Sequence, residues 1–150
     1  MEKRKICGVG IIDTDIDLKK NGRYINQYRT WRTMLRQAYG EGIKNRRVEG
    51  LTVCDDWFFF SNYKQWFDDN KKDRFYVSRD LKIPNNKHYS PETCVFVPYA
   101  WGRLFPNGSK ELIFKEMHHC RIEYKSNETL MLLVDLILER YQKNISAHND

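Results

Sequence analysis

The sequence has few of the features that are typical of membrane-embedded proteins, of secreted proteins or of proteins with a structural zinc site. Its four cysteines include no Cys-x-x-Cys pair, which disfavours a structural zinc site, and we expect all four to be reduced thiols. No apolar run approaches the ~20 residues of a membrane-spanning helix, and Met1–Gly8 contains no apolar signal-peptide core. These absences predict a cytoplasmic protein without a membrane partner.

The composition and the charge predict a folded domain with one basic region. Of the 150 residues, 41% are apolar and 14% aromatic, which is enough for a hydrophobic core. Residues 1–50 hold 12 Lys and Arg against 6 Asp and Glu, whereas residues 51–150 hold 14 of each kind. The formal net charge of +6 therefore comes from the first third, which suggests a nucleic acid or another acidic partner. A solvated, solubilising face is an equally good interpretation of the composition alone.

Residues 26–39 are predicted to form a helix with one apolar and one basic face. The apolar stripe recurs at helical spacing and consists of Tyr28, Trp31, Met34, Leu35 and Ala38. Arg29, Arg32 and Arg36 fall on another face, where their guanidinium groups can contact successive phosphates. Further basic residues follow in the glycine-punctuated loop 40–50 and enlarge this patch. An ordinary solvated helix face remains the alternative.

A second helix is expected to begin at a cap formed by Asp55 or Asp56 and to run to about Asn70. Its aromatic residues recur at helical spacing, which favours packing in the core over a platform for stacking bases. They are Trp57, Phe60, Tyr63, Trp66 and Phe67. Across the chain, four large aromatic residues are expected in the core: Trp31, Trp57, Trp66 and Phe96.

The middle of the chain has turn-forming residues between two segments that are predicted to be strands. Val77–Leu81 is predicted to be the first strand, and the turn-rich Pro84–Lys87 follows it. Ser90–Glu92 has the chemistry of a capped tight turn, and Cys94–Val97 is a short apolar run typical of a buried strand. A short helix or turn is expected at Tyr99–Phe105.

The C-terminal third is predicted to contain a β-hairpin and a helix. Glu111–Glu116 and His119–Tyr124 are interpreted as the two strands, and Asn127–Gln142 as a helix that its first residue caps. The domain organisation expected from this order is a core with a basic N-terminal region at 1–106. The hairpin and helix at 107–150 are expected to pack on the same domain.

Tyr89–Pro98 reads Tyr-Ser-Pro-Glu-Thr-Cys-Val-Phe-Val-Pro, and it resembles the signature of a phage and prophage family of HNH-like (His-Me finger) nuclease-related proteins. Further stretches resemble that family in the same order: Gly8–Asp13, Tyr28–Arg36, and Val53–Trp57 with Phe60–Trp66. The resemblance implies a small α+β domain whose ββα centre is packed by N-terminal helices. The expected strand–strand–helix at the C-terminus is similar in order to the DNA-binding module of plant ethylene-response transcription factors, which follows the core in many members and would be shortened here.

The residues at the family's catalytic positions have changed. The resemblance places the metal-binding aspartate of an HNH site at Ser78, the general base at Arg79 and a helix asparagine at Gly102. Neither Ser78 nor Gly102 offers a carboxylate or amide ligand, and an arginine cannot act as a base near neutral pH. The chain therefore resembles a catalytically degenerate member of the family.

The function expected from the basic face and the resemblance is nucleic-acid binding, with DNA favoured over RNA and no resident cofactor. The residues expected to contact phosphate are Arg29, Arg32, Arg36, Lys44, Arg46, Arg47, Arg79 and Lys87. One alternative is an HNH-type endonuclease that depends on Mg²⁺ or Mn²⁺ and uses Asp80, His88 and Glu92. Another is an inhibitor that binds a host defence protein or a nucleoprotein complex in the host cytoplasm.

Overall fold

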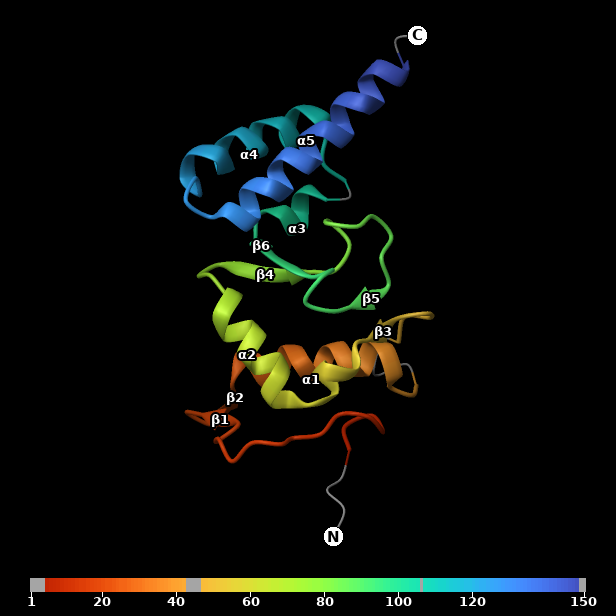
Figure 1. The fold of residues 1–150 in the computed structure, drawn as a ribbon, viewed down its shortest axis with the longest axis vertical. Helices are drawn as coiled ribbons and strands as arrows, with labels where there is room; N and C mark the ends of the chain where they lie inside the picture. The colour runs from red at the N-terminus through yellow and green to blue at the C-terminus, as the bar shows by residue number, and fades with distance from the viewer. Residues whose placement is uncertain (1–4, 43–46, 106, 149–150) are drawn as a thin grey trace. The chain divides into compact units, whose positions relative to one another are not determined.

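The computed structural model describes residues 5–42, 47–105 and 107–148, and it shows a small α+β protein, as predicted (Figure 1). Contacts between residues divide the chain into two compact units. The N-terminal unit consists of residues 1–71 and 85–94, and the C-terminal unit of residues 72–84 and 95–150. The chain therefore passes from one unit to the other three times.

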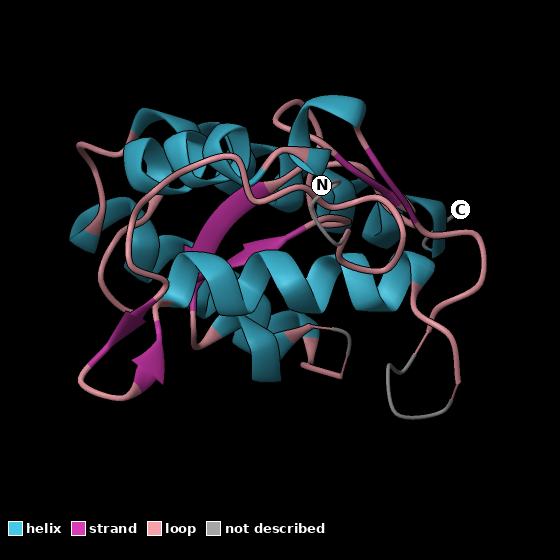
Figure 2. Cartoon of the chain, turned by 90° about the horizontal axis from the view of Figure 1, so that it is seen from below, coloured by secondary structure: helices cyan, strands magenta, loops and turns pink. Residues whose placement is uncertain are grey.

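The N-terminal unit is built around two helices. Its elements are β1 (Lys19–Lys20), β2 (Arg23–Tyr24), α1 (Asn26–Tyr39), β3 (Thr52–Val53), the 3₁₀ turn η2 (Asp55–Phe58), α2 (Phe60–Asn70) and β5 (His88–Tyr89). Strands β1 and β2 form an antiparallel hairpin, whereas β3 pairs with β5 in parallel. Figure 2 shows the hairpin beside one end of α1. Helix α1 has the bounds predicted from its apolar stripe, and all five stripe residues are buried.

Helix α2 begins without a side-chain cap from its own N-cap residue, Phe59. The carboxylate of Asp13 takes that role and accepts a hydrogen bond of 2.8 Å from the backbone N–H of Ser61. The expectation that Asp55 or Asp56 would cap this helix is wrong, because both residues lie within η2. The cap comes from a segment 48 residues away along the chain.

The predicted strand–loop–strand–helix order is present, and its strands and helix belong to the C-terminal unit, whereas residues 85–94 of the loop belong to the N-terminal unit. Strands β4 (Phe75–Ser78) and β6 (Val95–Pro98) pair in antiparallel fashion, with Val77 opposite Phe96. The short helix α3 (Trp101–Leu104) follows β6 directly, and Trp101 is fully buried. A ββα arrangement is therefore present between residues 75 and 104.

The predicted β-hairpin at 111–124 is wrong, because this segment forms the helix α4 (Lys110–Glu123). The hydroxyl of Ser109 caps it and accepts a hydrogen bond of 3.2 Å from the N–H of Leu112. Ile113, Met117 and Cys120 recur at steps of four and three, and all three are buried. Burial raises the pKa of the Cys120 thiol to about 12, which keeps it neutral in the core.

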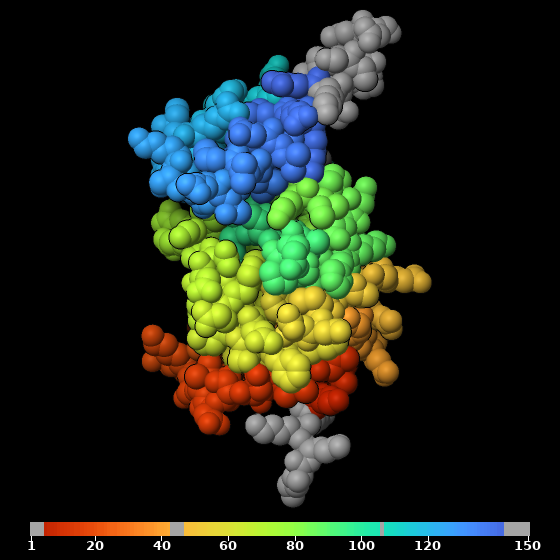
Figure 3. All heavy atoms as spheres, in the orientation of Figure 1, coloured from red at the N-terminus to blue at the C-terminus, as the bar shows by residue number. Residues whose placement is uncertain are grey.

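The last helix, α5 (Glu128–His148), begins as expected at Asn127, whose side chain accepts a 3.1 Å hydrogen bond from the N–H of Leu130. Its apolar stripe packs against α4, and the two helices form one continuous layer (Figure 3). The C-terminal third is therefore a pair of helices and not the expected strand–strand–helix. The expected similarity in order to the plant transcription-factor module is wrong. Although α5 has 21 residues, the described part of the chain contains no helix long and apolar enough to cross a membrane.

Three of the four aromatic residues expected in the core are buried, whereas Trp66 is only half-buried. The buried three are Trp31, Trp57 and Phe96. Each residue turns a helix by about 100°, so Phe60, Tyr63 and Phe67 lie within an arc of about 60°. Trp66 lies about 60° beyond that arc, at the edge of the apolar stripe. The expectation that Trp66 belongs to the core is therefore wrong.

Candidate nucleic-acid interface

The β1–β2 hairpin presents a pair of like charges that the sequence analysis missed. Asn21 and Gly22 form its turn, with φ angles of 54° and 77°. The two-residue type I′ hairpin turn requires positive φ at both central residues, and Asn-Gly is the dipeptide that favours it. The Asn21-Gly22 dipeptide could therefore have predicted this hairpin from the sequence. The register places Lys20 directly opposite Arg23, and both side chains are exposed. Like charges at paired positions destabilise a hairpin, so this arrangement is unfavourable unless an anion lies nearby.

Tyr24 fixes the hairpin to α1 through cation–π contacts. The ammonium of Lys19 lies 4.9 Å from the centre of its ring, and the guanidinium of Arg32 lies 4.8 Å from the same centre. Arg32 also lies 5.3 Å from the ring centre of Tyr28. Its Nε is buried and has no hydrogen-bond partner among the described residues. Arg32 is therefore half-buried and joins the hairpin to the helix, rather than standing in an exposed row with its neighbours.

The two outer arginines of the predicted row do face solvent. Arg29 and Arg36 are exposed, and their seven-residue separation differs from two full helical turns by only about 20°. Within the described residues, neither has an ion-pair partner, and the same holds for Lys20 and Arg23. We refer to these four residues, Lys20, Arg23, Arg29 and Arg36, as the basic surface. Burial raises the pKa of the Cys7 thiol, and the charge of Arg36 offsets part of that increase.

The other predicted phosphate contacts are dispersed. Arg47 is exposed beyond the end of α1, and the Lys87 ammonium donates a 3.3 Å hydrogen bond to the backbone carbonyl of Glu49. Arg79 belongs to the C-terminal unit and is half-buried there. Lys44 and Arg46 lie outside the described residues.

The residues of the alternative nuclease site are exposed, and they come from both units. His88 and Glu92 belong to the N-terminal unit, and the His88 Nδ1 lies 2.7 Å from the hydroxyl of Thr52. Asp80 belongs to the C-terminal unit. Over 5–42, 47–105 and 107–148, the structure contains no cluster of three or more His, Cys, Asp and Glu side chains arranged to hold a metal ion.

Ser78 and Gly102, two positions that the sequence analysis singled out, lie in the ββα segment. Ser78 is buried, and its hydroxyl accepts a 3.3 Å hydrogen bond from the N–H of Leu81. A side chain built on Gly102 would begin 3.5 Å from the hydroxyl of Tyr76. The guanidinium of Arg140 donates a 2.6 Å hydrogen bond to the carbonyl of Lys82, which ties α5 to the loop after β4.

We expect the purified protein not to cleave plasmid DNA in the presence of Mg²⁺ or Mn²⁺. The resemblance to HNH-like proteins assigns the base and metal positions to Arg79, Ser78 and Gly102, and these side chains supply neither a base nor a carboxylate or amide ligand. Agarose-gel nicking assays with each metal and with EDTA measure this directly. Metal-dependent nicking that Asp80→Ala or His88→Ala abolishes would contradict the prediction and support the nuclease alternative.

No protein-family model matches the sequence, and searches of curated proteins and of solved structures also found no match.

Proposed function

We propose that the protein binds nucleic acid through the basic surface formed by the β1–β2 hairpin and α1. The observation that carries this proposal is the pairing of Lys20 with Arg23 across a hairpin that contains no counter-charge for either of them. A phosphate backbone would neutralise both charges and turn an unfavourable cross-strand pair into a favourable contact. Arg29 and Arg36 add two further exposed cations on α1.

Duplex DNA is the nucleic acid that this surface fits best. The major groove of B-DNA admits a helix or a two-stranded ribbon, whereas the major groove of duplex RNA is too narrow for side chains to read. The exposed groups of the basic surface are all cationic, and such contacts position a protein on the backbone without reading its sequence. The binding is therefore expected to tolerate different base sequences.

The resemblance to phage HNH-like proteins supports the same proposal. In that interpretation the chain is a phage-derived protein whose ββα centre has lost its base and its metal ligands at Arg79, Ser78 and Gly102. Binding would then be the activity that remains, and it would take place in the host cytoplasm. The contacts of Ser78 and Arg140 support a structural use of this segment.

Fluorescence anisotropy with two unrelated 20-bp DNA duplexes tests the proposal across a series of salt concentrations. Four phosphate contacts predict that the logarithm of the association constant falls with the logarithm of salt with a slope of about −3.6, equally for both duplexes. A duplex RNA of the same length is expected to bind less tightly. Absence of binding at 50 mM salt, or a slope shallower than about −1, would contradict the proposal.

A further inference from the structure

A hollow of about 420 Å³ lies on the N-terminal unit, beside the C-terminal half of α2. Trp66 lines it, and the indole is half-buried although it is one of the largest side chains in the unit. Its ring centre lies 4.8 Å from that of Trp57 and 6.0 Å from that of Tyr63, so neighbouring aromatic rings hold its position. The hollow therefore has a rigid aromatic wall.

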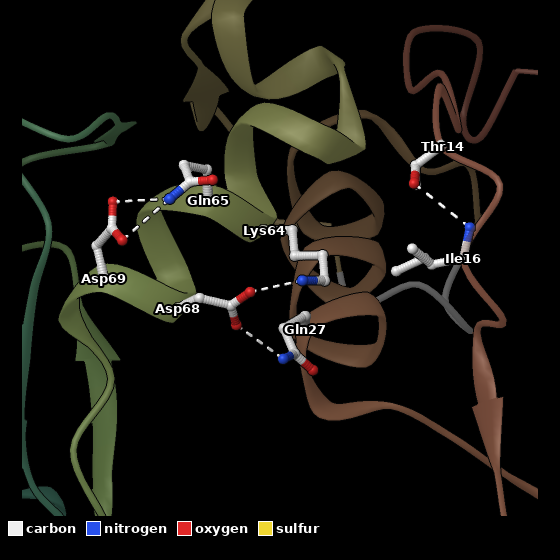
Figure 4. A network of polar contacts seen from close by, with 7 residues as sticks. All are labelled: Thr14, Ile16, Gln27, Lys64, Gln65, Asp68 and Asp69. Atoms are coloured by element: carbon white, nitrogen blue, oxygen red, sulfur yellow. Dashed lines mark hydrogen bonds and ion pairs between the residues drawn. The ribbon is translucent and has the colours of Figure 1, made fainter.

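Two carboxylates give the hollow a negative charge. Asp56 and Asp69 line it, and neither has an ion-pair partner within the described residues. Among the described residues, Asp69 accepts hydrogen bonds from the neutral amide of Gln65 alone, at 3.0 and 3.1 Å (Figure 4). The adjacent Asp68 is different, because Lys64 lies 2.6 Å from its carboxylate.

The end of α2 adds to this negative potential. The C-terminus of a helix carries the negative end of its dipole, and basic side chains are favoured there. The last turn of α2 has no basic residue and carries Asp68 and Asp69, and Lys71 follows it as the C-cap residue. A cation bound at this end would therefore gain from the helix dipole as well as from the carboxylates.

Each amide side chain of the hollow already donates to an acceptor within the unit. Asn62 donates 2.9 Å to the backbone carbonyl of Asp56, and Asn70 donates 2.7 Å to that of Trp66. Gln65 donates to Asp69. The acceptor that each nitrogen meets fixes the orientation of the amide group, so the amide oxygens are available as acceptors, and Asn62 and Asn70 each keep a second N–H. The hollow thus offers carboxylate and amide oxygens beside an aromatic ring.

We propose that this hollow binds a guanidinium group, namely the side chain of an arginine on a partner protein. Guanidinium has five N–H donors and no acceptor, is planar, and stacks on an indole ring, so it complements the carboxylates, the amide oxygens and the ring of Trp66. A lysine ammonium is more strongly hydrated and cannot stack, so it fits less well. The proposal does not depend on the basic surface, which consists of other residues.

NMR titration of ¹⁵N-labelled protein tests the site with N-acetyl-arginine methylamide as the probe. We expect saturable shifts of the Trp66 indole N–H and of the Gln65 side-chain amide at millimolar concentrations. The lysine analogue should bind at least fivefold more weakly, and the uncharged citrulline analogue should cause no saturable shift. Equal shifts with citrulline, or none with arginine, would overturn the proposal.

Matched variants locate the site. Asp56→Asn and Asp69→Asn preserve shape and should each weaken arginine binding at least fivefold, because each removes one charge. Asp55→Asn removes a neighbouring charge that does not line the hollow and should have less than a twofold effect. DNA affinity should not weaken in any of the three variants, so failure of this proposal is distinguishable from failure of the proposed function. A similar loss in the Asp55→Asn variant would overturn the assignment.

A peptide with one arginine distinguishes a partner side chain from a free metabolite. Gly-Ser-Arg-Ser-Gly should bind at least as tightly as the capped amino acid if the hollow receives an arginine within a chain. Weaker binding of the peptide would overturn the partner assignment. Sedimentation equilibrium of the protein alone tests a second copy as the occupant: a dimer that Asp69→Asn dissociates would also overturn it.

Discussion

Replacing Trp31 by alanine is expected to lower the free energy of unfolding by about 3–5 kcal/mol, as truncation of a large buried aromatic residue does. Trp31 is fully buried between α1 and α2, and its ring centre lies 5.2 Å from that of Phe60. Its indole N–H donates a 2.7 Å hydrogen bond to the backbone carbonyl of Trp57, which the alanine variant leaves unpaired. Urea unfolding followed by far-UV circular dichroism measures the change.

The backbone of the N-terminal segment packs against Trp31, so the protein has little room to collapse into the space that the alanine variant would leave. A methyl group built on Gly10 would lie 2.5 Å from the Leu35 side chain and 3.0 Å from the ring of Trp31. The backbone at Gly10 is therefore packed directly on the indole of Trp31. A cavity left by Trp31→Ala would be enclosed by this backbone and by neighbouring side chains such as Phe60.

Trp66→Ala is the matched control for Trp31→Ala. Because Trp66 is half-buried at the edge of the stripe, its truncation is expected to cost less than half as much. Equal losses for the two variants would contradict the assignment of Trp66 to the wall of the hollow. A loss below about 1 kcal/mol for Trp31→Ala would contradict its central role in the core.

Periodicity predicted the elements that carry a long, regular apolar pattern. Helix α1 has its predicted bounds because five apolar residues follow one helical stripe and Gly40 ends it. Strands β4 and β6 were found within a few residues, because turn residues separate two short apolar runs. In each case local pattern and tertiary packing agree.

Helix α4 was missed because its short segments also fit an alternating pattern. Leu112 is exposed whereas Ile113 is buried, so the apolar residues of this helix do not all lie on one face. The steps of four and three between Ile113, Met117 and Cys120 fit a helix, and all three residues are buried in α4, which packs against α5. The Ser109 cap was a local signal for the helix that the strand interpretation ignored.

Several features of the candidate sites depend on contacts between distant parts of the sequence. The aromatic ring that holds Arg32 belongs to a hairpin, and no spacing rule for helices reveals that contact. Similarly, the hollow combines Asp56 in η2 with Asp69 at the end of α2. Sequence pattern predicted the charge of α1 but not which of its arginines would be held by tyrosine rings.

Replacing all four residues of the basic surface by alanine is expected to weaken DNA binding roughly a thousandfold at 0.1 M salt. Each lost phosphate contact removes the release of about 0.9 counterion, so the salt slope should flatten by about three to four units. Both duplex sequences should be affected alike, because the contacts are to the backbone. Anisotropy titrations over the same salt series measure both quantities.

A control with the same change in net charge separates local contact from general electrostatic attraction. It replaces four exposed basic residues of the C-terminal unit by alanine: Lys72, Arg103, Lys110 and Lys125. This variant should lose less than tenfold in affinity and keep most of its salt slope. Equal losses in the two variants would contradict a localised interface.

Stability distinguishes a binding surface from a structural one. Removing Lys20 and Arg23 eliminates two like charges at paired positions of β1 and β2, so the basic-surface variant should be as stable as the parent or slightly more stable. Exposed arginines on α1 contribute little to folding, so Arg29→Ala and Arg36→Ala should not reverse this. A variant that loses DNA binding and retains its urea midpoint would support the hairpin and α1 as the interface. Loss of more than about 1 kcal/mol of stability would instead assign these side chains a structural role.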